Sequence, residues 1–141
     1  MVELLNNQII WSILLAWLIA HSVKSIVKII KRNRIDHLAS NGFPSLHVTL
    51  VSALTFSVAF QEGWGSTLTV IAMVFAFIVI YDAVNIRYQA GLHAKVLNEQ
   101  TKPQKSIGRK LKENLGHTYI EALGGFILGL TLSLMSYYII S

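Results

Sequence analysis

The feature that most constrains this chain is a set of four long apolar runs separated by polar segments. A helix needs about 20 mostly apolar residues to cross roughly 30 Å of hydrocarbon. With 141 residues, 53% hydrophobic and 13% charged, the chain fits one compact unit too apolar for an ordinary soluble domain. We therefore predict a single all-α domain, an integral membrane bundle of four transmembrane helices over about residues 8–30, 45–61, 65–84 and 118–140.

Charge is distributed asymmetrically along the chain. The 12 lysines and arginines fall at the end of the first run and in the loop after it, at the end of the third run, and in the loop before the fourth. Since basic residues near span ends stay in the cytoplasm, both termini are predicted outside and both polar loops inside, in a multi-pass protein of the plasma or inner membrane. The net charge of +5 then favours lipid head groups or phosphate as partners, and not nucleic acid.

A basic amphipathic segment precedes the fourth run. Ile107, Leu111 and Leu115 recur at every fourth position among lysines and an arginine. This pattern predicts a cytoplasmic amphipathic helix, which either lies on the lipid surface or packs against the bundle.

Ionisable side chains gather at the predicted cytoplasmic ends of the runs, although charge is costly in a membrane. In a four-helix bundle these ends meet in one layer, which suits an anion with proton transfer nearby. For any one residue alone, a snorkelling lysine or a satisfied interfacial histidine is the simpler interpretation. The residues concerned are His21, Lys24, His47, Asp82, Arg87, His117 and Glu121.

The segment from Gly42 to His47 is predicted to open the second helix at the cytoplasmic face. Pro44 suits a first helical turn, since its missing N–H would be unpaired there. Backbone N–H groups and the positive end of the helix dipole can hold phosphate oxygens, and Ser45 adds a hydroxyl donor. His47, one turn in, could give a proton to a leaving oxygen.

The fourth run is preceded by a histidine and opened by a carboxylate. His117 and Glu121 are four residues apart, hence on one helical face, so the carboxylate can bond one imidazole nitrogen and leave the other as nucleophile or base. The pair could also be incidental, or half of a metal site. No second pair completes a ligand set, so no metal is predicted. Whether Asp82 pairs with Arg87 stays open, because i and i+5 is an imperfect helical spacing.

At these residues the sequence resembles a known family. The segments from Pro44 to His47 and from Gly116 to Glu121 look like the second and third motifs of the type 2 phosphatidic acid phosphatases, a superfamily shared with the vanadium haloperoxidases. The likeness is closest to its small, divergent bacterial and plant branch. There the pattern from Asp82 to Gly91 also recurs, and the likeness runs over most of the chain.

The resemblance implies an enzyme that needs no metal or other cofactor, a phosphatase that acts through a phosphohistidine. By this resemblance His117 attacks phosphorus, Glu121 orients it, and His47 protonates the leaving alcohol. The expected substrate is a lipid phosphate monoester or an isoprenyl (pyro)phosphate. The residues placed at the substrate, as a clamp on developing charge or along its border, are Lys24, Ser45, Leu46, Asp82 and Arg87.

The chain departs from the family pattern at several positions. Leu46 stands where a glycine usually follows the motif serine, and Glu121 stands where aspartate is usual. Leu111 stands where an arginine is expected, so Arg87 is the candidate to replace that arginine, with Arg109 and Lys112 as alternatives. Four predicted spans are fewer than the family's six-helix core, which a homodimer could complete. Gly125 and Gly129 have the spacing that lets two membrane helices approach, either between chains or within one.

Two other functions fit the sequence. A non-catalytic membrane protein that binds anionic lipid or a partner protein, with a degenerate phosphatase site, accounts more easily for Leu46 and Leu111. An ion or proton pathway needs polar residues along the spans, whose outer halves offer only scattered serine and threonine. The enzyme is the preferred hypothesis and the binding protein its alternative.

Overall fold

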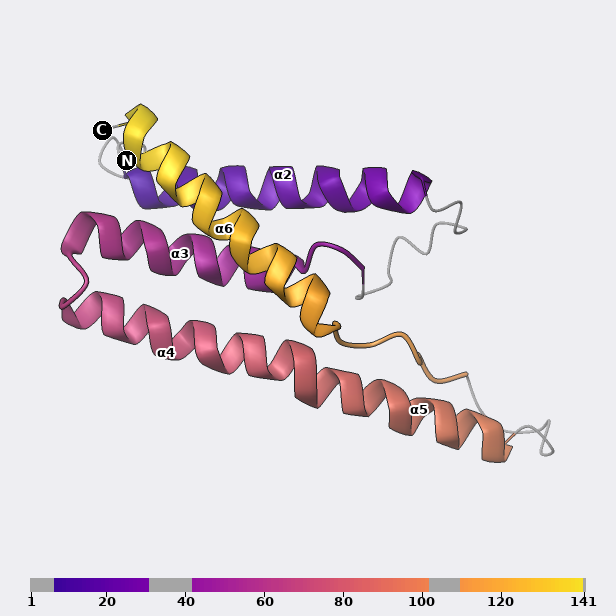
Figure 1. Ribbon diagram of the computed structural model, residues 1–141. Coiled ribbons are helices and arrows are strands. Elements are labelled where there is room, and N and C mark those ends of the chain that lie inside the picture. The colour runs from indigo at the N-terminus through magenta and orange to yellow at the C-terminus, as the bar shows by residue number, and fades with distance from the viewer. Residues whose placement is uncertain (1–6, 31–41, 102–109, 141) are drawn as a thin grey trace.

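The computed structural model describes residues 7–30, 42–101 and 110–140. This part of the chain is helical and contains no strand, and a helix occupies each segment predicted as a span (Figure 1). The all-α prediction is therefore confirmed for it. In chain order the elements are α2 (Gln8–Ile30), α3 (Leu46–Glu62), α4 (Thr67–Tyr81), the π-helical η1 (Asp82–Ile86), α5 (Arg87–Thr101) and α6 (Tyr119–Ile140).

Successive long helices run in opposite directions (Figure 1). At one end of the bundle, the Gln8 amide donates to the Ser136 carbonyl at 2.8 Å and accepts from the Gln61 amide at 3.0 Å. These bonds join the start of α2 to the ends of α3 and α6. At the other end, the Ser45 N–H donates to the Glu121 carbonyl at 3.0 Å, which joins the starts of α3 and α6. The predicted site segments therefore share one end of the bundle.

Small residues let the helices pack closely around α3, which contacts α2, α4 and α6. A Cβ added to Gly125 would lie 2.6 Å from the Ser45 carbonyl oxygen, and one added to Gly129 would lie 2.6 Å from that of Thr49. Only glycine permits this approach of α6 to α3, so the glycine spacing is used within one chain. The buried residues of α2 are also small: Ser12, Ala16 and Ala20.

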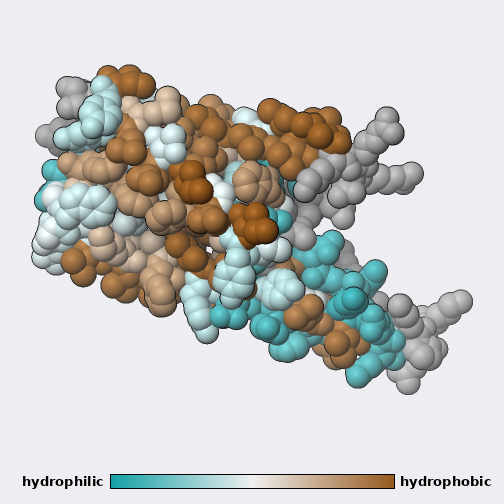
Figure 2. Space-filling model, viewed as in Figure 1, coloured by the Kyte–Doolittle hydropathy of each residue, from teal (hydrophilic) through white to brown (hydrophobic). Residues whose placement is uncertain are grey.

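The outer surface of the bundle is apolar. Within the described ranges, three helical stretches are long and apolar enough to cross a membrane: Gln8–Ile30, Thr67–Gln100 and Tyr119–Ile139. Their large side chains face outward, with Leu18 at 56% and Phe77 at 70% exposure. So extensive an exposed apolar surface indicates contact with lipid. Figure 2 shows the hydrophilic residues gathered over α5, beyond the apolar part.

Two predictions about the polar region between the third and fourth runs are corrected. The third helix continues through η1 and α5 to Thr101, past the predicted end at residue 84, because loss of hydrophobicity does not itself end a helix. The predicted amphipathic helix is not found in residues 110–118, which are not helical and follow the surface of α5. Ile107 lies outside the described residues.

Candidate active site

His117 and Glu121 are in contact, but not across the face of a helix. His117 Nδ1 lies 2.9 Å from Glu121 Oε2. Because α6 begins at Tyr119, His117 reaches the carboxylate from the turn before the helix, so the predicted contact is present and the predicted helical geometry is wrong. The His117 side chain is only 2% exposed, and Nε2 has no hydrogen-bond partner among the described residues.

Glu121 also closes the first turn of α6. Its Oε2 accepts from the Thr118 N–H at 3.2 Å, and the Thr118 hydroxyl accepts from the Glu121 N–H at 3.3 Å. This reciprocal pair is a capping box. The Gly42 N–H is a further donor to the carboxylate. One side chain thus ties together His117, the start of α6 and the segment before α3.

Two glycines let the segment that carries His117 lie directly against α5. Gly116 has a φ of 75°, and a Cβ there would overlap the backbone of Tyr88. A Cβ on Gly91 would lie 2.5 Å from a carbonyl oxygen of the same segment. The His117 N–H then donates to the Ala83 carbonyl at 2.9 Å. These contacts fix the imidazole beside η1.

The start of α3 differs in detail from the prediction. Ser45 is the N-cap, so Pro44 precedes the helix and does not occupy its first turn, and the peptide bond before Pro44 is cis. Ser45 is buried, and its hydroxyl makes no hydrogen bond within the described residues. Leu46 is half-buried, and the exposed His47 lies in the first turn itself. The helix end thus places a buried hydroxyl beside N–H groups that no helical carbonyl can reach.

Charged side chains from α2, η1 and the start of α5 lie near the N-terminal end of α3. Lys24, half-buried on α2, interacts electrostatically with Glu121 and Lys112. A Cβ on Gly42 would touch the Lys24 Cε at 3.5 Å, so the lysine reaches the segment before α3. His21 instead stacks on Trp17, with ring centroids 5.6 Å apart. The ionisable groups near enough to interact electrostatically with His47 are Arg87, His117, Lys24 and Asp82.

Asp82 and Arg87 form an ion pair that an α-helix would not allow. Arg87 Nε donates to Asp82 Oδ2, and the Arg87 backbone N–H donates to the Asp82 carbonyl. In a π-helix such as η1 the backbone bonds join residues five apart, so these two residues lie on the same side. The structure therefore shows that Asp82 and Arg87 pair, which their spacing in the sequence left open. The guanidinium has five N–H donors, so donors remain for an anion.

The chemistry that this cluster can perform follows from two atoms. His117 Nε2 and Ser45 Oγ are both buried, and neither has a partner within the described part of the chain. Since buried polar groups are normally hydrogen-bonded, such exceptions need a reason, and a ligand supplies one. A proton on Nδ1, shared with Glu121, leaves a lone pair on Nε2. Among the described residues, no three His, Cys, Asp and Glu side chains group as metal ligands.

Two residues that hold the segment around His117 in place, Thr118 and Asn98, were not predicted from the sequence. The capping box at Thr118 could have been found, because its Thr-x-x-Glu signal is present. Asn98 could not, since its partners lie 13 and 15 residues away. It donates to the Leu111 carbonyl and to Glu113 Oε1, both at 2.8 Å, and accepts from the Leu111 N–H at 2.9 Å. The bond from Asn98 is the main reason that the pKa of Glu113 lies below its ordinary value.

Residues 5–132, nearly the whole chain, match the model of the Divergent PAP2 family. The chain belongs to this family. The resemblance drawn from the motif residues is thereby confirmed, and the match includes every residue of the cluster described above.

One relative extends the comparison beyond the family model. This Divergent PAP2 chain is 32% identical to the "Uncharacterized membrane protein YuiD" of Bacillus subtilis (strain 168), over 96% of this chain and 98% of the relative. No solved structure matches it. The chain is therefore a PAP2-related, multi-pass membrane protein.

Proposed function

We propose that the protein is a metal-independent membrane phosphatase that hydrolyses a lipid phosphate monoester or an isoprenyl (pyro)phosphate through a phosphohistidine. The observation that carries the proposal is the state of His117, whose Nδ1 is bonded to Glu121 while Nε2 is buried without a partner in the described residues. A histidine oriented by a carboxylate, with its second nitrogen free, is suited to act as nucleophile or base. Family membership supports the same chemistry.

In the first step, Nε2 of His117 attacks phosphorus, a P–N bond forms, and the P–O bond to the leaving group breaks. His47 donates a proton to the departing oxygen. In the second step, His47 takes a proton from water as the water oxygen attacks phosphorus. The P–N bond then breaks, inorganic phosphate leaves and His117 is restored. The Glu121 carboxylate holds the imidazole in one orientation and stabilises its positive charge.

The phosphoryl oxygens are held from three elements in this proposal. Ser45 donates at the N-terminus of α3, where the helix dipole also favours negative charge. Lys24 adds charge from α2, and Arg87 from the start of α5, held there by Asp82. Leu46 borders the phosphate beside Ser45. Removing one preorganised donor from such a clamp typically lowers kcat by about 10²–10³.

Phosphate release by the purified protein tests the proposal, with phosphatidic acid and isoprenyl mono- and diphosphates as substrates. We expect His117→Asn to abolish both phosphate release and acid-labile labelling of the protein by radiolabelled substrate. Asparagine retains a donor near the position of Nδ1, which preserves the contact with Glu121. His93→Ala, at an exposed position of α5, is the matched control and should keep its activity. Equal release from His117→Asn and the unchanged protein would contradict the mechanism.

The second candidate function is a non-catalytic protein that binds anionic lipid or a partner through the same cluster. The capping box favours it, because that contact gives Glu121 a structural role without catalysis. In that case no substrate releases phosphate, while binding of phosphatidic acid vesicles persists in His117→Asn and falls steeply with added salt.

We also propose that the bundle is one transmembrane domain with four spans, both termini outside, and the site at the cytoplasmic face of the plasma or inner membrane. The 17 residues of α3 extend about 26 Å, close to the hydrocarbon thickness. α3 begins beside the start of α6 and ends beside the start of α2. It therefore covers the same depth as α2 and α6 and runs in the opposite direction to both. The lysines and arginines set the orientation.

A further inference from the structure

The side chain of Phe43, in the segment before α3, lies directly on the backbone of α6. A Cβ added to Gly124 would lie 2.1 Å from Phe43 Cε2 and 2.5 Å from Phe43 Cζ, so an alanine there would collide with the ring. The ring therefore occupies the space that a side chain at position 124 would fill. Phe43 is 38% exposed, so most of its surface is covered.

This contact lies on the same face of α6 as the carboxylate of the candidate site. Glu121 and Gly124 are three residues apart in α6, and residues at that spacing are neighbours on a helix surface. The Gly42 N–H donates to the Glu121 carboxylate, and the ring of the next residue, Phe43, covers Gly124. Two consecutive residues of the segment before α3 thus contact one turn of α6.

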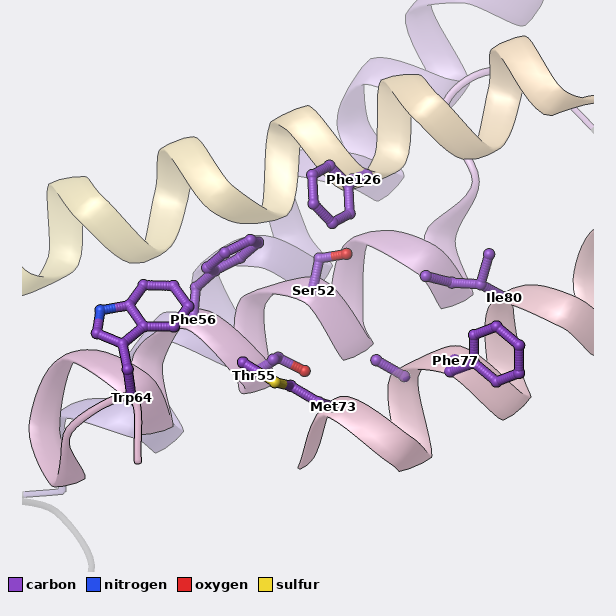
Figure 3. Close-up of a pocket in the computed structure, with 9 residues that line it drawn as sticks. Ser52, Thr55, Phe56, Trp64, Met73, Phe77, Ile80 and Phe126 are labelled. Atoms are coloured by element: carbon purple, nitrogen blue, oxygen red, sulfur yellow. The ribbon is translucent and has the colours of Figure 1, made fainter. Parts of the chain in front are cut away.

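Phe126, on α6 itself, faces away from this contact. It follows Gly124 by two residues, about 200° around the helix. It lines a groove of about 290 Å³ between α3, α4 and α6, whose wall includes neither Phe43 nor Gly124 (Figure 3). Phe126 is also 38% exposed. It is therefore a matched comparison for Phe43: the same residue type, equally exposed, in contact with a different region.

The conformation of Gly42 explains why its N–H needs an anchor. Its φ is 119°, in a region that glycine adopts readily and other residues rarely do. Glycine has the most backbone freedom of any residue and no side chain to pack, so Gly42 cannot fix the direction of its own N–H. The next residue can fix it, because the Phe43 ring is held on α6.

We propose that Phe43 is a positioning residue for the candidate site, an inference that rests on the proposed function. By packing on Gly124, its ring keeps the Gly42 N–H directed at Glu121, and the carboxylate in turn stays in contact with His117 Nδ1. Phe43 acts through Glu121 and not on the substrate. Its loss should therefore weaken the contact between Glu121 and His117 and slow the chemical step, while the fold is retained.

The proton between His117 Nδ1 and Glu121 provides a test that does not depend on turnover. An imidazole N–H bonded to a carboxylate has a proton resonance downfield of the backbone amides, and the burial of His117 slows its exchange with water. In protein with isotope-labelled histidine, the signal is assigned by its loss in His117→Asn. We expect Phe43→Ala to shift this signal upfield or broaden it, and Phe126→Ala to leave it unchanged.

An exchange of volume between the two contact partners makes the test specific. Gly124→Ala should displace the ring and lower kcat about ten- to hundredfold, the cost of moving a catalytic group by up to about 1 Å. A purely structural role predicts no loss, because alanine is a better helix former than glycine. Phe43→Leu lacks Cε2 and Cζ, the two atoms that the added methyl would meet most closely. Combined with Gly124→Ala, it should restore the His117 signal and bring kcat to within about threefold of the unchanged protein.

Two results would overturn the inference. One is an unchanged His117 signal in Phe43→Ala or, should that variant fail to fold, in Gly124→Ala. The other is an equal loss in Gly124→Ala with and without Phe43→Leu, which would mean that the methyl disturbs the helix and not the ring. Failure of the phosphatase proposal looks different: the unchanged protein releases no phosphate, while the His117 signal still responds to Phe43→Ala and Gly124→Ala.

Discussion

At the scale of single residues, Glu121 combines two roles that can be separated. Its carboxylate accepts from His117 Nδ1 and from the backbone of Thr118 and Gly42. Capping requires only an oxygen acceptor, which glutamine also supplies. Orientation and charge stabilisation of an imidazole require the carboxylate. The two roles therefore respond differently to different substitutions.

We expect Glu121→Gln to lower kcat by roughly 10²–10⁴, with little change in thermal stability, because the cap survives and the charge is lost. Thr118→Ala should do the reverse: it removes the cap, destabilises the protein by about 1 kcal/mol and leaves kcat nearly unchanged. Phosphate release and thermal unfolding, measured in the same detergent, check both. If the two variants lost activity and stability in parallel, Glu121 would act through the fold alone.

The proximity of the candidate residues could be predicted from the sequence better than their geometry. His47, His117, Lys24 and Arg87 converge as expected, because the ends of antiparallel helices must meet in one layer. The position of His117 before α6 could not be read from an i, i+4 spacing, since that rule holds only inside a helix.

At the scale of elements, η1 shows where helical periodicity fails. Residues five apart in an α-helix point about 140° from each other, so Asp82 and Arg87 would diverge. The π-helix inserts one extra residue per turn and brings the two side chains together. Local sequence carries no signal for this insertion. It is stabilised by long-range contacts, such as the bond from His117 to Ala83, which a residue-by-residue reading does not include.

The segment before α6 is held to α5 by Asn98. We expect Asn98→Ala to speed hydrogen exchange of the Leu111 amide by at least about thirtyfold, because the two bonds to Leu111, worth about 1 kcal/mol each, are lost together with the bond to Glu113. Gln100→Ala, at an exposed position of the same helix, is the control. An unchanged exchange rate in Asn98→Ala would show that other contacts hold the segment.

The same contact predicts a dependence on pH. Hydrogen bonding from Asn98 lowers the pKa of Glu113, so the bond is intact above the ordinary value of 4.5. Its contribution is lost only as the pH falls from there through the lowered pKa of the folded protein. At neutral pH Glu113 is therefore ionised and its bond from Asn98 is intact.

At the scale of the whole molecule, the segregation of charge and the direction of the helices describe the same architecture. Basic residues predict which face lies in the cytoplasm, whatever the internal details of each helix. The bonds of Gln8 to Gln61 and Ser136 place the start of α2 and the ends of α3 and α6 together, on the end without lysine or arginine. This agreement makes the topology testable without any assumption about catalysis.

The absence of cysteine from the sequence makes that test direct, because any introduced cysteine is the only thiol. With a membrane-impermeant thiol reagent on intact cells, we expect labelling of Asn7→Cys and Glu62→Cys, and labelling of His93→Cys only after permeabilisation. All three positions are exposed. If α3 did not cross, Glu62→Cys would be protected and His93→Cys labelled, whereas an inverted orientation would label His93→Cys alone. Because the site lies at the same end of the bundle as α5, labelling of His93→Cys in intact cells would move the proposed chemistry to the outer face of the membrane.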